Sequence, residues 1–480
     1  MKSKIIYLLL SISTLYICSC GEDRSGEYEA RIAEDKWIKE QMDNIYLWYY
    51  DMPEESKLDF FKVPEDFFKS LLSTKCQEGK GDKYSYLETI ETKSRSIDSE
   101  STYGFDFVLF QPSQTPKQMV ARVLFVLKDS PAAKAGIKRG NWISAVNGEV
   151  LTKDNYGYLY KGAEAEFSLA QVDTIDNTAL WKDTANVKVS ASQPIENNPF
   201  YLDTVYHIGG KNIAYMMYNA FATGPTDNPY DETYNNQMRS IFAGFKGANV
   251  NDFILDMRYN PGGYLSCSQV LASLLAPADK LGQPYCSLAF NDLNETKDTT
   301  YTLREDLTGG NNLNLSRLYV IVTDQTASAS EAVINCLRPY MEIKLIGTKT
   351  EGKNVASLPI KTEEFPGIIL HPIVAIVNNS KGESNYFKGM TPDYELNEAD
   401  NAKLVDALQP LGDTNEYLLK NTLTLVTTGS IPGLETEEEE KNETKAILNR
   451  NSNISVTRWT GKKEKETGCC SHPAKPVIVY

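Results

Sequence analysis

The stretch from Leu318 to Leu337 joins an apolar run to a helix-like run through a turn of small residues. Leu318–Val322 is β-branched and aromatic, which predicts a buried strand, and Ala332–Leu337 has the apolar spacing of a helix. The turn between them, Thr326–Glu331, reads Thr-Ala-Ser-Ala-Ser-Glu. A serine at such a turn has its hydroxyl near backbone N–H groups that lack intrahelical partners and can stabilise an oxyanion. The pattern indicates nucleophilic chemistry if a base lies nearby.

A loop that follows the next predicted strand supplies the candidate base. Ile343–Ile346 predicts the strand, and the loop Gly347–Asn354 contains two lysines. A strand–helix–strand unit places both strand ends at one edge of a sheet, so Ser328 and Lys353 can meet there. None of the three histidines lies in a run that resembles a catalytic triad; they are His207, His371 and His472. We expect His371, inside an apolar run, to be a core residue.

Three motifs of the chain resemble the C-terminal processing peptidases, or tail-specific proteases. The motifs are Thr-Ala-Ser-Ala-Ser-Glu, a Gly-Lys pair downstream, and Asp-Met-Arg-Tyr-Asn-Pro-Gly-Gly at residues 256–263. In that family the first serine of Ser-Ala-Ser-Glu is the nucleophile and a lysine 25 residues later is its general base; the matching positions are Ser328 and Lys353. The family places a glutamine four residues after the lysine to orient it. This chain has Ser357 there, which can still hydrogen-bond an amine although its reach is shorter.

The resemblance also implies an oxyanion hole made of backbone N–H groups. The donors would be Ala329, next to the nucleophile, and either Gly262 or Gly263. Two adjacent glycines after a strand allow positive φ and close backbone approach, although Asn-Pro-Gly-Gly alone also forms tight turns. We expect Asp256 and Arg258 to fix this turn through buried polar contacts rather than to take part in the chemistry.

A lysine accepts a proton only when its amine is neutral, so the base must be buried. The reference pKa is about 10.4, and burial away from anions has to bring it to ~7–8, at a cost of about 4 kcal/mol for the charged form. Glu351 would raise the lysine pKa if it pointed inward, so we expect it to face solvent. Lys344 and Lys349 also lie in this region, and the spacing together with the preceding Gly352 selects Lys353.

Residues 101–190 resemble a PDZ domain. Two strand-like runs are followed by Ala-Gly-Ile, Gly-Asn-Trp-Ile and Val-Asn-Gly, which match PDZ signatures except that Asn141 replaces an aspartate. Such a domain leaves a sheet edge open for an extended peptide and binds the peptide's terminal carboxylate with backbone N–H groups. The resemblance assigns the carboxylate-binding loop to four residues: Tyr103, Gly104, Phe105 and Phe107. Asp106 adds a negative charge there, and a domain that only gates or scaffolds the catalytic part is the alternative.

Composition excludes several classes of function. The net charge is −15, from 49 basic and 64 acidic residues, and no Lys/Arg-rich block is present, so we exclude nucleic acids as partners. Eight cysteines in 480 residues do not make a disulfide framework, and the pair Cys469-Cys470 lacks metal-ligand spacing. We therefore predict no metal site and no cofactor.

The first twenty residues have the anatomy of a secretory signal. Two lysines precede the apolar run Ile5–Leu15, and Ile17-Cys-Ser-Cys20 after it resembles a bacterial lipobox. Cleavage before Cys20 would leave a lipidated cysteine, which predicts an envelope protein anchored to the bacterial outer membrane by lipid. A plain signal peptide or an uncleaved anchor is the alternative. No second apolar run approaches the ~18 residues of a membrane span.

Apolar spacing predicts helices at 37–49, 64–72, 233–247, 265–275 and 402–411, and a polar loop at 85–101. Strands that alternate with the later helices indicate an α/β layer on a largely parallel sheet. The predicted architecture is a multidomain α/β protein with seven parts: signal peptide 1–19, lipidated tether 20–34, small helical N-terminal domain 35–100, PDZ β-sandwich-like domain 101–190, linker 191–199, ClpP/crotonase-like α/β catalytic domain 200–429, and polar C-terminal tail 430–480.

The functional hypothesis is a secreted, lipid-anchored serine endopeptidase with a Ser-Lys dyad. It would bind unfolded or C-terminal segments of protein substrates and cleave them by acyl transfer. One alternative keeps the fold and the peptide groove but has lost turnover, which the serine at position 357 suggests. A second alternative keeps the fold, shared with crotonase-like proteins, and binds lipid or another apolar small molecule.

Overall fold

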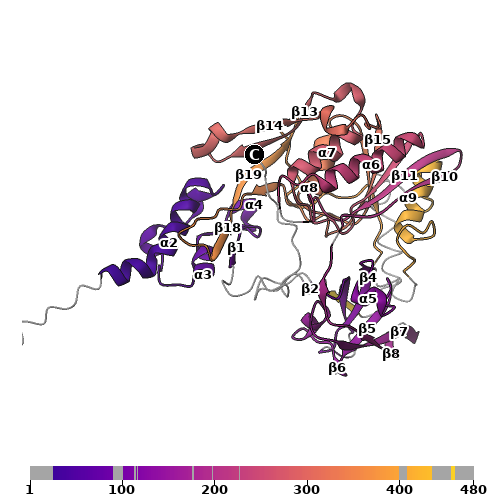
Figure 1. Cartoon of the computed structure of the whole chain (residues 1–480), viewed down its shortest axis with the longest axis horizontal. Coiled ribbons are helices and arrows are strands. Elements are labelled where there is room, and N and C mark those ends of the chain that lie inside the picture. The colour runs from indigo at the N-terminus through magenta and orange to yellow at the C-terminus, as the bar shows by residue number, and fades with distance from the viewer. Residues whose placement is uncertain are drawn as a thin grey trace, which may run out of the picture.

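The computed structural model describes residues 25–89, 101–112, 115, 117–175, 178–196, 198–225, 228–398, 408–434 and 456–459. The predicted signal peptide and the predicted lipidation site at Cys20 lie outside these residues. Figure 1 shows three parts: helices α2–α4 at the N-terminal end, an α/β part that carries α6–α9, and a separate β-rich part. Within the described ranges, no helix is both long and apolar enough to cross a membrane.

The N-terminal part is mainly helical. It contains α2 (Ser25–Ile45), α3 (Pro64–Leu71), the short α4 (Cys76–Gly79) and two 3-10 turns, Tyr49–Asp51 and Glu55–Lys57. α3 begins with proline, whose missing N–H costs nothing at a helix start, and its Phe67, Phe68 and Leu71 are buried. They pack with residues of α2 in one apolar cluster. The helix predicted from Pro64 is confirmed. The helix predicted at 37–49 is present but has other bounds: α2 begins at Ser25, within the predicted tether 20–34, and ends at Ile45.

The loop predicted at 85–101 is wrong at its start. Tyr86–Thr89 forms strand β1, which pairs antiparallel with β18 (Ile368–His371) of the α/β part, and residues 90–100 lie outside the described chain. Both strands are short, and each gains its hydrogen bonds from a partner about 280 residues away in sequence. Local sequence pattern cannot reveal such a pairing.

The β-rich part, here called the β-domain, is built on one antiparallel sheet of residues 105–189. Its strands are β3 (Phe105–Pro112), β4 (Val120–Val126), β5 (Trp142–Val146), β6 (Glu149–Val150), β7 (Ala165–Ile175) and β8 (Thr178–Val189). The short helix α5 (Pro131–Lys134) and a 3-10 turn at Tyr156–Leu159 complete it, and Ser130 caps α5 by accepting from the Ala133 N–H. Strands β2 (Ser101–Thr102) and β9 (Gln193–Pro194) pair where the chain enters and leaves the β-domain.

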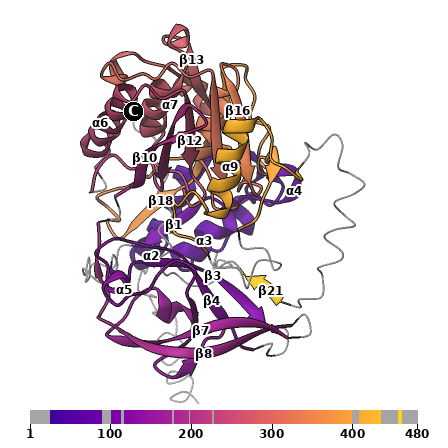
Figure 2. The same ribbon diagram turned by 90° about the vertical axis from the view of Figure 1, so that its right-hand side faces the viewer.

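A segment near the C-terminus joins the β-domain. Strand β21 (Val456–Trp459) pairs antiparallel with the Leu109–Pro112 half of β3, so that it forms the edge of the sheet in the order β21-β3-β4-β5-β7-β8. Figure 2 shows β21 beside β3 and β4. The backbone of β3 that faces away from β4 is therefore an edge that accepts an added strand.

The α/β part is organised around a six-stranded sheet in the order β10-β11-β12-β15-β16-β20. The strands are β10 (Phe200–Ile208), β11 (Lys211–Tyr218), β12 (Asp252–Asp256), β15 (Arg317–Val322), β16 (Glu342–Gly347) and β20 (Tyr394–Glu395). All neighbours are parallel except β10 and β11. Helices α6 (Thr233–Gly247), α7 (Leu265–Leu275) and α8 (Ala329–Leu337) connect them, and the first two match the predicted helices residue for residue.

A second sheet covers the other side of these helices. It is antiparallel, in the order β14-β13-β19-β17, with strands β13 (Pro284–Phe290), β14 (Thr299–Thr302), β17 (Val355–Ser357) and β19 (Ile373–Asn379). All nine residues of α8 are buried, and they share one apolar core with α7, β13 and β19. The helix that carries the serine motif is therefore a rigid central element.

One further helix, α9 (Tyr417–Thr428), packs on the opposite face of the six-stranded sheet. It lies in front of β16 in Figure 2. Of the closing helix predicted at 402–411, residues 402–407 lie outside the described residues, and residues 408–411 are not helical.

Candidate active site

Ser328 lies at the turn between β15 and α8, as predicted. It caps the helix with φ 57° and ψ −115°, a backbone conformation that costs a non-glycine residue on the order of 1–3 kcal/mol. Three hydrogen bonds to the β12 loop hold the turn: Ala327 N to Asn260 O, Ser330 Oγ to Asn260 O, and Thr326 Oγ1 to Met257 O. Strain that the surrounding structure maintains at a serine between a strand and a helix is typical of a nucleophile elbow.

Glu331 connects this turn to the lysine loop. The Ser328 N–H and the Lys353 N–H both donate to its Oε2, at 3.0 and 2.8 Å, and Gly352 N and Thr350 Oγ1 donate to its Oε1, at 2.8 and 2.5 Å. The carboxylate is fully buried. Burial raises the pKa of Glu331 to about 7, while the four hydrogen bonds lower it. One side chain thus brings the backbones of residues 328 and 353 to a single oxygen atom.

Sequence reasoning gave Glu331 no role, although a signal was present. Serine followed three residues later by glutamate is the capping-box pattern, in which the glutamate accepts from the N–H of the capping serine. The structure forms that bond and adds three donors from the loop at 350–353, which no local pattern indicates.

The first glycine of the Asn-Pro-Gly-Gly segment lies against the serine turn. Gly262 has φ +101°, and a Cβ built on it would lie 2.7 Å from Ser328 Cβ and 2.9 Å from Ala329 N. Its own N–H donates to Asn260 Oδ1 at 2.9 Å. Gly263 has φ +139° and forms a parallel bridge with Phe221. In this bridge Phe221 N donates to Gly262 O and Tyr264 N donates to Phe221 O, so neither bond uses Gly263 itself. Among the described residues, the N–H groups of Gly263 and Ala329 donate to no protein acceptor.

Lys353 follows Gly352, whose φ of +92° and close contact with the backbone of Phe387 exclude a side chain. The Lys353 ammonium lies 5.3 Å from the ring centre of Tyr84, a residue of the N-terminal part. Glu351 was expected to face solvent; instead its carboxylate is 24% exposed and pairs with Lys83 Nζ at 2.8 Å. A cation therefore compensates the anion that would otherwise act on Lys353.

The other lysines of the region lie elsewhere. Lys344 is on β16 and pairs with Glu342 at 3.3 Å. The Lys349 stem packs near Gly389.

Ser357 ends β17 inside the antiparallel sheet and is fully buried. His371 is a buried residue of β18, as predicted: its Nε2 lies 3.2 Å from Glu88 Oε2, and its ring stacks on Tyr86 at 4.3 Å.

A buried charge network supports the β12 loop. Arg258 is 0% exposed and bonds to Asp256 at 2.7 Å, to Glu398 at 2.8 Å and to Glu416 at 2.9 Å. Burial would raise the pKa of Glu398, but the charges of Arg139 and Arg258 lower it to about 2. The expectation that Asp256 and Arg258 fix this turn through buried contacts is confirmed.

The β-domain contributes to the same network. Arg139, which follows α5, donates to Glu398 at 2.7 Å, to Glu416 at 3.1 Å and to Tyr259 Oη at 2.8 Å. Phe125 of β4 stacks on Tyr259 with ring centres 5.2 Å apart. Tyr259 directly precedes Asn260, so the position of the β-domain is linked to the loop that carries the two glycines.

The predicted carboxylate-binding loop has its side chains in the β-domain core. Tyr103, Phe105 and Phe107 are buried together, and Tyr103 Oη donates to Ala163 O at 2.5 Å. Two N–H groups of the loop are already bonded: Gly104 N to Thr102 Oγ1 at 3.0 Å, and Phe107 N to the side chain of Asp106 at 2.8 Å. Burial raises the pKa of Asp106 to about 6. A carboxylate would have to compete for these two donors.

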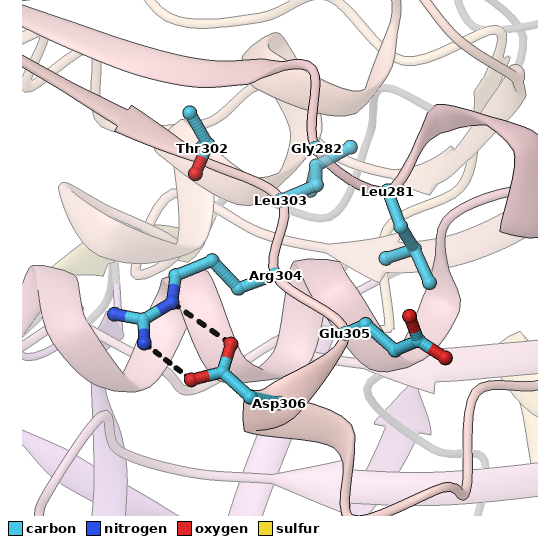
Figure 3. Close-up of a pocket in the computed structure, with 7 residues that line it drawn as sticks. All are labelled: Leu281, Gly282, Thr302, Leu303, Arg304, Glu305 and Asp306. Carbon is cyan, nitrogen blue, oxygen red and sulfur yellow. Dashed lines mark hydrogen bonds and ion pairs between the residues drawn. The ribbon is translucent and has the colours of Figure 1, made fainter.

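The pocket drawn in Figure 3 lies away from the serine turn. Its volume is about 560 Å³, and it is lined by Leu281, Gly282 and residues 302–306, where the Arg304 and Asp306 side chains pair. It contains none of the predicted site residues. The described part of the chain holds no cluster of three or more His, Cys, Asp or Glu side chains suited to a metal ion, and its four cysteines are buried and reduced.

Comparison with known proteins decides the family. The model of "Peptidase family S41" matches residues 212–396, and the model of the "Peptidase S41 N-terminal domain" matches residues 33–86. A protein of Bacteroides fragilis whose crystal structure is assigned to the S41 proteases has 34% sequence identity to this chain. The two structures superpose with a TM-score of 0.71, and the match covers 82% of this chain and 97% of that one. The chain belongs to peptidase family S41. The range of the S41 model includes Ser328 and Lys353, and that of the S41 N-terminal model includes Tyr84.

More distant S41 relatives carry the name "Probable CtpA-like serine protease". The protein of Staphylococcus haemolyticus is 24% identical over 343 residues, which are 70% of this chain and 62% of that protein. The protein of Staphylococcus epidermidis is 23% identical over 393 residues, 82% of this chain and 71% of that protein. The match thus spans less than two thirds of the first of these S41 relatives.

Proposed function

We propose that this S41 protein is a serine endopeptidase in which Ser328 is the nucleophile and Lys353 the general base. The observation that carries the proposal is the shared carboxylate oxygen of Glu331, which accepts from the N–H of both residues. The strained turn at Ser328 presents its hydroxyl at the start of α8. The names of the S41 relatives agree with this activity.

Cleavage would proceed by acyl transfer. Ser328 Oγ attacks the peptide carbonyl carbon while its proton passes to the Lys353 amine, and the resulting oxyanion collapses with departure of the amine product, which takes up that proton. Water then attacks the acyl-enzyme ester, and the same lysine accepts the water's proton and returns it to Ser328 Oγ. No cofactor is needed for these steps.

Backbone N–H groups of Ala329 and Gly263 are the preferred oxyanion donors. Ala329 directly follows Ser328, and Gly263 directly follows Gly262, which packs against the serine turn. Neither N–H donates to a protein acceptor in the described chain, whereas the N–H of Gly262 is bonded to Asn260. Gly262 would instead supply the space next to the nucleophile, because a side chain there would meet Ser328 Cβ. Each well-placed donor is worth about 2.7–4 kcal/mol in acyl-transfer enzymes.

The β-domain is proposed to act as a PDZ domain that takes C-terminal or unfolded peptide segments. The outer edge of β3 supports this, since β21 of the same chain pairs with it there as an added antiparallel strand. Binding would rest on main-chain hydrogen bonds along β3 more than on carboxylate capture, because Thr102 and Asp106 hold two loop N–H groups.

The secretory signal and Cys20 support export and a lipid anchor. In this proposal the protein lies on the envelope of a bacterium, attached to the outer membrane, and meets protein substrates there. Metabolic labelling with an alkyne fatty acid checks the anchor, since Cys20→Ser should remove the label.

Replacement of Ser328 or Lys353 by alanine tests the activity. We expect both variants to lose cleavage of a denatured protein, and Ser328→Ala to lose labelling by a fluorophosphonate probe. Lys344→Ala is the matched control, because this lysine pairs with Glu342 on β16 and should leave cleavage unchanged. Cleavage that survives in Ser328→Ala would disprove the proposal.

Serine at position 357 favours one second candidate, a peptide-binding protein without turnover. Wild-type protein that binds peptide but neither cleaves nor reacts with the probe would favour this candidate. Lipid that co-purifies with the inactive protein would point to the lipid-binding variant of the same idea.

A further inference from the structure

A loop of the N-terminal part reaches the lysine of the proposed dyad. In residues 82–85, Lys83 Nζ pairs with Glu351 Oε1 at 2.8 Å, and Tyr84 presents its ring to Lys353 Nζ at 5.3 Å. The same ring lies 4.9 Å from Lys83 Nζ. The N-terminal part therefore covers the side of Lys353 with an aromatic surface.

Hydrogen bonds fix this loop before any substrate arrives. Asp82 Oδ1 accepts from the N–H of Tyr84 at 2.8 Å and of Ser85 at 3.0 Å, and Asp82 Oδ2 accepts from Tyr46 Oη at 2.9 Å. On the other side, Ser85 Oγ accepts from Ile373 N of β19 at 2.8 Å. The loop is thus attached both to the N-terminal helices and to the α/β part, and its side chains have little freedom to move away.

From this placement we infer that Tyr84 is a positioning residue of the catalytic base. Its ring keeps bulk water from the Lys353 amine and restricts the directions in which that amine can point. The inference rests on the proposed Ser328–Lys353 dyad. It adds a residue from the N-terminal part to a reaction centre otherwise built from β12, β15, α8 and the loop at 347–354.

The ring has two opposing effects on the pKa of Lys353, and their balance determines the direction of the expected shift. Exclusion of water disfavours the ammonium form and can lower a lysine pKa by up to about 3–5 when burial is complete. Attraction of a cation to a ring face favours the ammonium form and is worth about 1.5 pKa units when the pair is desolvated. Lys353 is partly buried, and in this inference exclusion of water is the larger effect, so that the ring keeps the amine closer to the neutral form that accepts a proton.

Charged and titratable groups lie beside the loop that carries the lysine. Glu351 is paired with Lys83, Glu331 receives four hydrogen bonds, and Tyr386 is buried nearby. Burial and the charges of Glu351, Glu331 and Asp82 raise the pKa of Tyr84 well above its ordinary value. Its hydroxyl is therefore neutral and does not compete with Lys353 as a base.

Three variants of the full chain separate the ring from its hydroxyl. Tyr84→Phe keeps the ring, Tyr84→Leu keeps apolar cover, and Tyr84→Ala opens the side of Lys353 to water. We expect Tyr84→Phe to stay within about threefold of wild type in kcat for peptide cleavage. Tyr84→Ala should lose at least tenfold in kcat with KM within about threefold, and the acidic limb of its pH–kcat profile should move to higher pH. Tyr84→Leu should keep the wild-type limb.

The pH limb distinguishes positioning of the base from a purely structural role. Glu331 is present in all variants, and burial raises its pKa. If Tyr84→Ala admitted water to Glu331, its pKa would fall and the limb would move to lower pH, which is opposite to the shift expected from Lys353. Tyr50→Ala, at a tyrosine of the same part that is 69% exposed, is the control for loss of an aromatic side chain. An unchanged acidic limb in Tyr84→Ala would overturn the inference. If Tyr84→Ala fails to fold, Tyr84→Leu provides the test, because leucine keeps apolar cover over Lys353. An acidic limb in Tyr84→Leu that moves to higher pH by as much as is expected for Tyr84→Ala would also overturn the inference.

Probe labelling separates this test from that of the proposed function. If wild-type protein neither cleaves peptide nor is labelled at Ser328, the proposed dyad is wrong, and the inference about Tyr84 is wrong with it. Active wild-type protein combined with unaffected Tyr84 variants removes the role of Tyr84 alone.

Discussion

At the scale of single residues, Glu331 does most to bring the site together. Its two carboxylate oxygens accept hydrogen bonds from the N–H groups of Ser328 and Lys353, and from two groups of the loop that precedes the lysine. Burial holds its pKa near 7 although these donors favour the charge. The same group therefore connects the geometry of the site to pH.

We expect Glu331→Gln to lower kcat at least tenfold. An amide offers one acceptor oxygen, so either the pair of donors from Ser328 and Lys353 or the pair from Thr350 and Gly352 would face an NH₂ group. Steady-state cleavage and probe labelling measure the loss. Glu342→Gln, at a carboxylate 42% exposed, is the matched control. Equal rates for the two variants would contradict the role of Glu331.

Stability and activity should respond to pH in opposite directions through Glu331. Its folded pKa of about 7 lies above the ordinary 4.5, so the group stabilises the fold fully below pH 4.5 and this contribution is lost as pH rises through 7. The hydrogen bonds at the turn need the charged form, so activity should instead rise over this range. Thermal unfolding from pH 5 to 8, compared between wild type and Glu331→Gln, should show the wild type losing its relative advantage as pH rises. A constant difference would refute the assignment.

Gly262 permits the close approach of two loops. Gly262→Ala should abolish cleavage, because the added Cβ would lie 2.7 Å from Ser328 Cβ. Gly282→Ala is a sharp control: its φ of +92° resembles the +101° of Gly262, but no atom lies within 4 Å of its Cβ position. Both variants pay a backbone cost of roughly 1–2 kcal/mol, which unfolding experiments will show. Only the first should lose probe labelling.

At the scale of elements, β21 and β3 show how a peptide can join the β-domain. A chain ended at residue 434 lacks β21, which pairs with Leu109–Pro112. We expect it to bind an extended peptide with an apolar C-terminus more tightly than the full chain does, because the edge is no longer occupied. Fluorescence anisotropy with a labelled peptide measures this. Unchanged affinity would show that peptides bind elsewhere.

The same scale shows what sequence can and cannot predict. Helix α6 was predicted to the residue because its apolar stripe of period 3.6 indicates burial on one side. Helix α7 was also predicted to the residue, and its apolar sequence fits a helix that is buried nearly all round. Strand β1 was missed because Tyr86–Thr89 becomes a strand only through β18, far along the chain. Strands β13 and β14 were not predicted, because they belong to an antiparallel sheet, whereas the alternation of strands and helices indicates only parallel units.

The site itself divides in a similar way. The turn at Ser328 and the glycines at 262 and 263 belong to contiguous motifs, so sequence could indicate them. The roles of Lys83 and Tyr84 depend on a loop that meets residues 351 and 353 only in the folded chain. No spacing rule links positions about 270 apart, which is why these residues were not predicted.

At the scale of the whole molecule, a buried charge network joins the β-domain to the α/β part. Arg139 of the β-domain and Arg258 of the β12 loop share Glu398 and Glu416. The two arginines hold the pKa of Glu398 at about 2, below its ordinary 4.5. Its stabilising contribution is thus present above pH 4.5 and is lost as pH falls through 2, on the order of 3 kcal/mol.

We expect Glu398→Gln to unfold at a lower temperature than wild type at pH 7 and to approach wild type as pH falls from 4.5 toward 2. Loss of one partner from a buried ion network costs about 3–5 kcal/mol. Calorimetry at a series of pH values measures both effects. A gap between the two proteins that persists at pH 2 would show that the carboxylate charge is not the cause.

Strand β1 is hydrogen-bonded into the α/β part and directly follows the loop that carries Lys83 and Tyr84. The N-terminal region that matches the family is therefore not only a structural support, because it also contributes residues next to the proposed catalytic lysine. A protein trimmed to residues 200–429 would keep its serine and its lysine yet lose one wall around the amine. Modular exchange of the N-terminal part between relatives should for that reason alter turnover as well as folding.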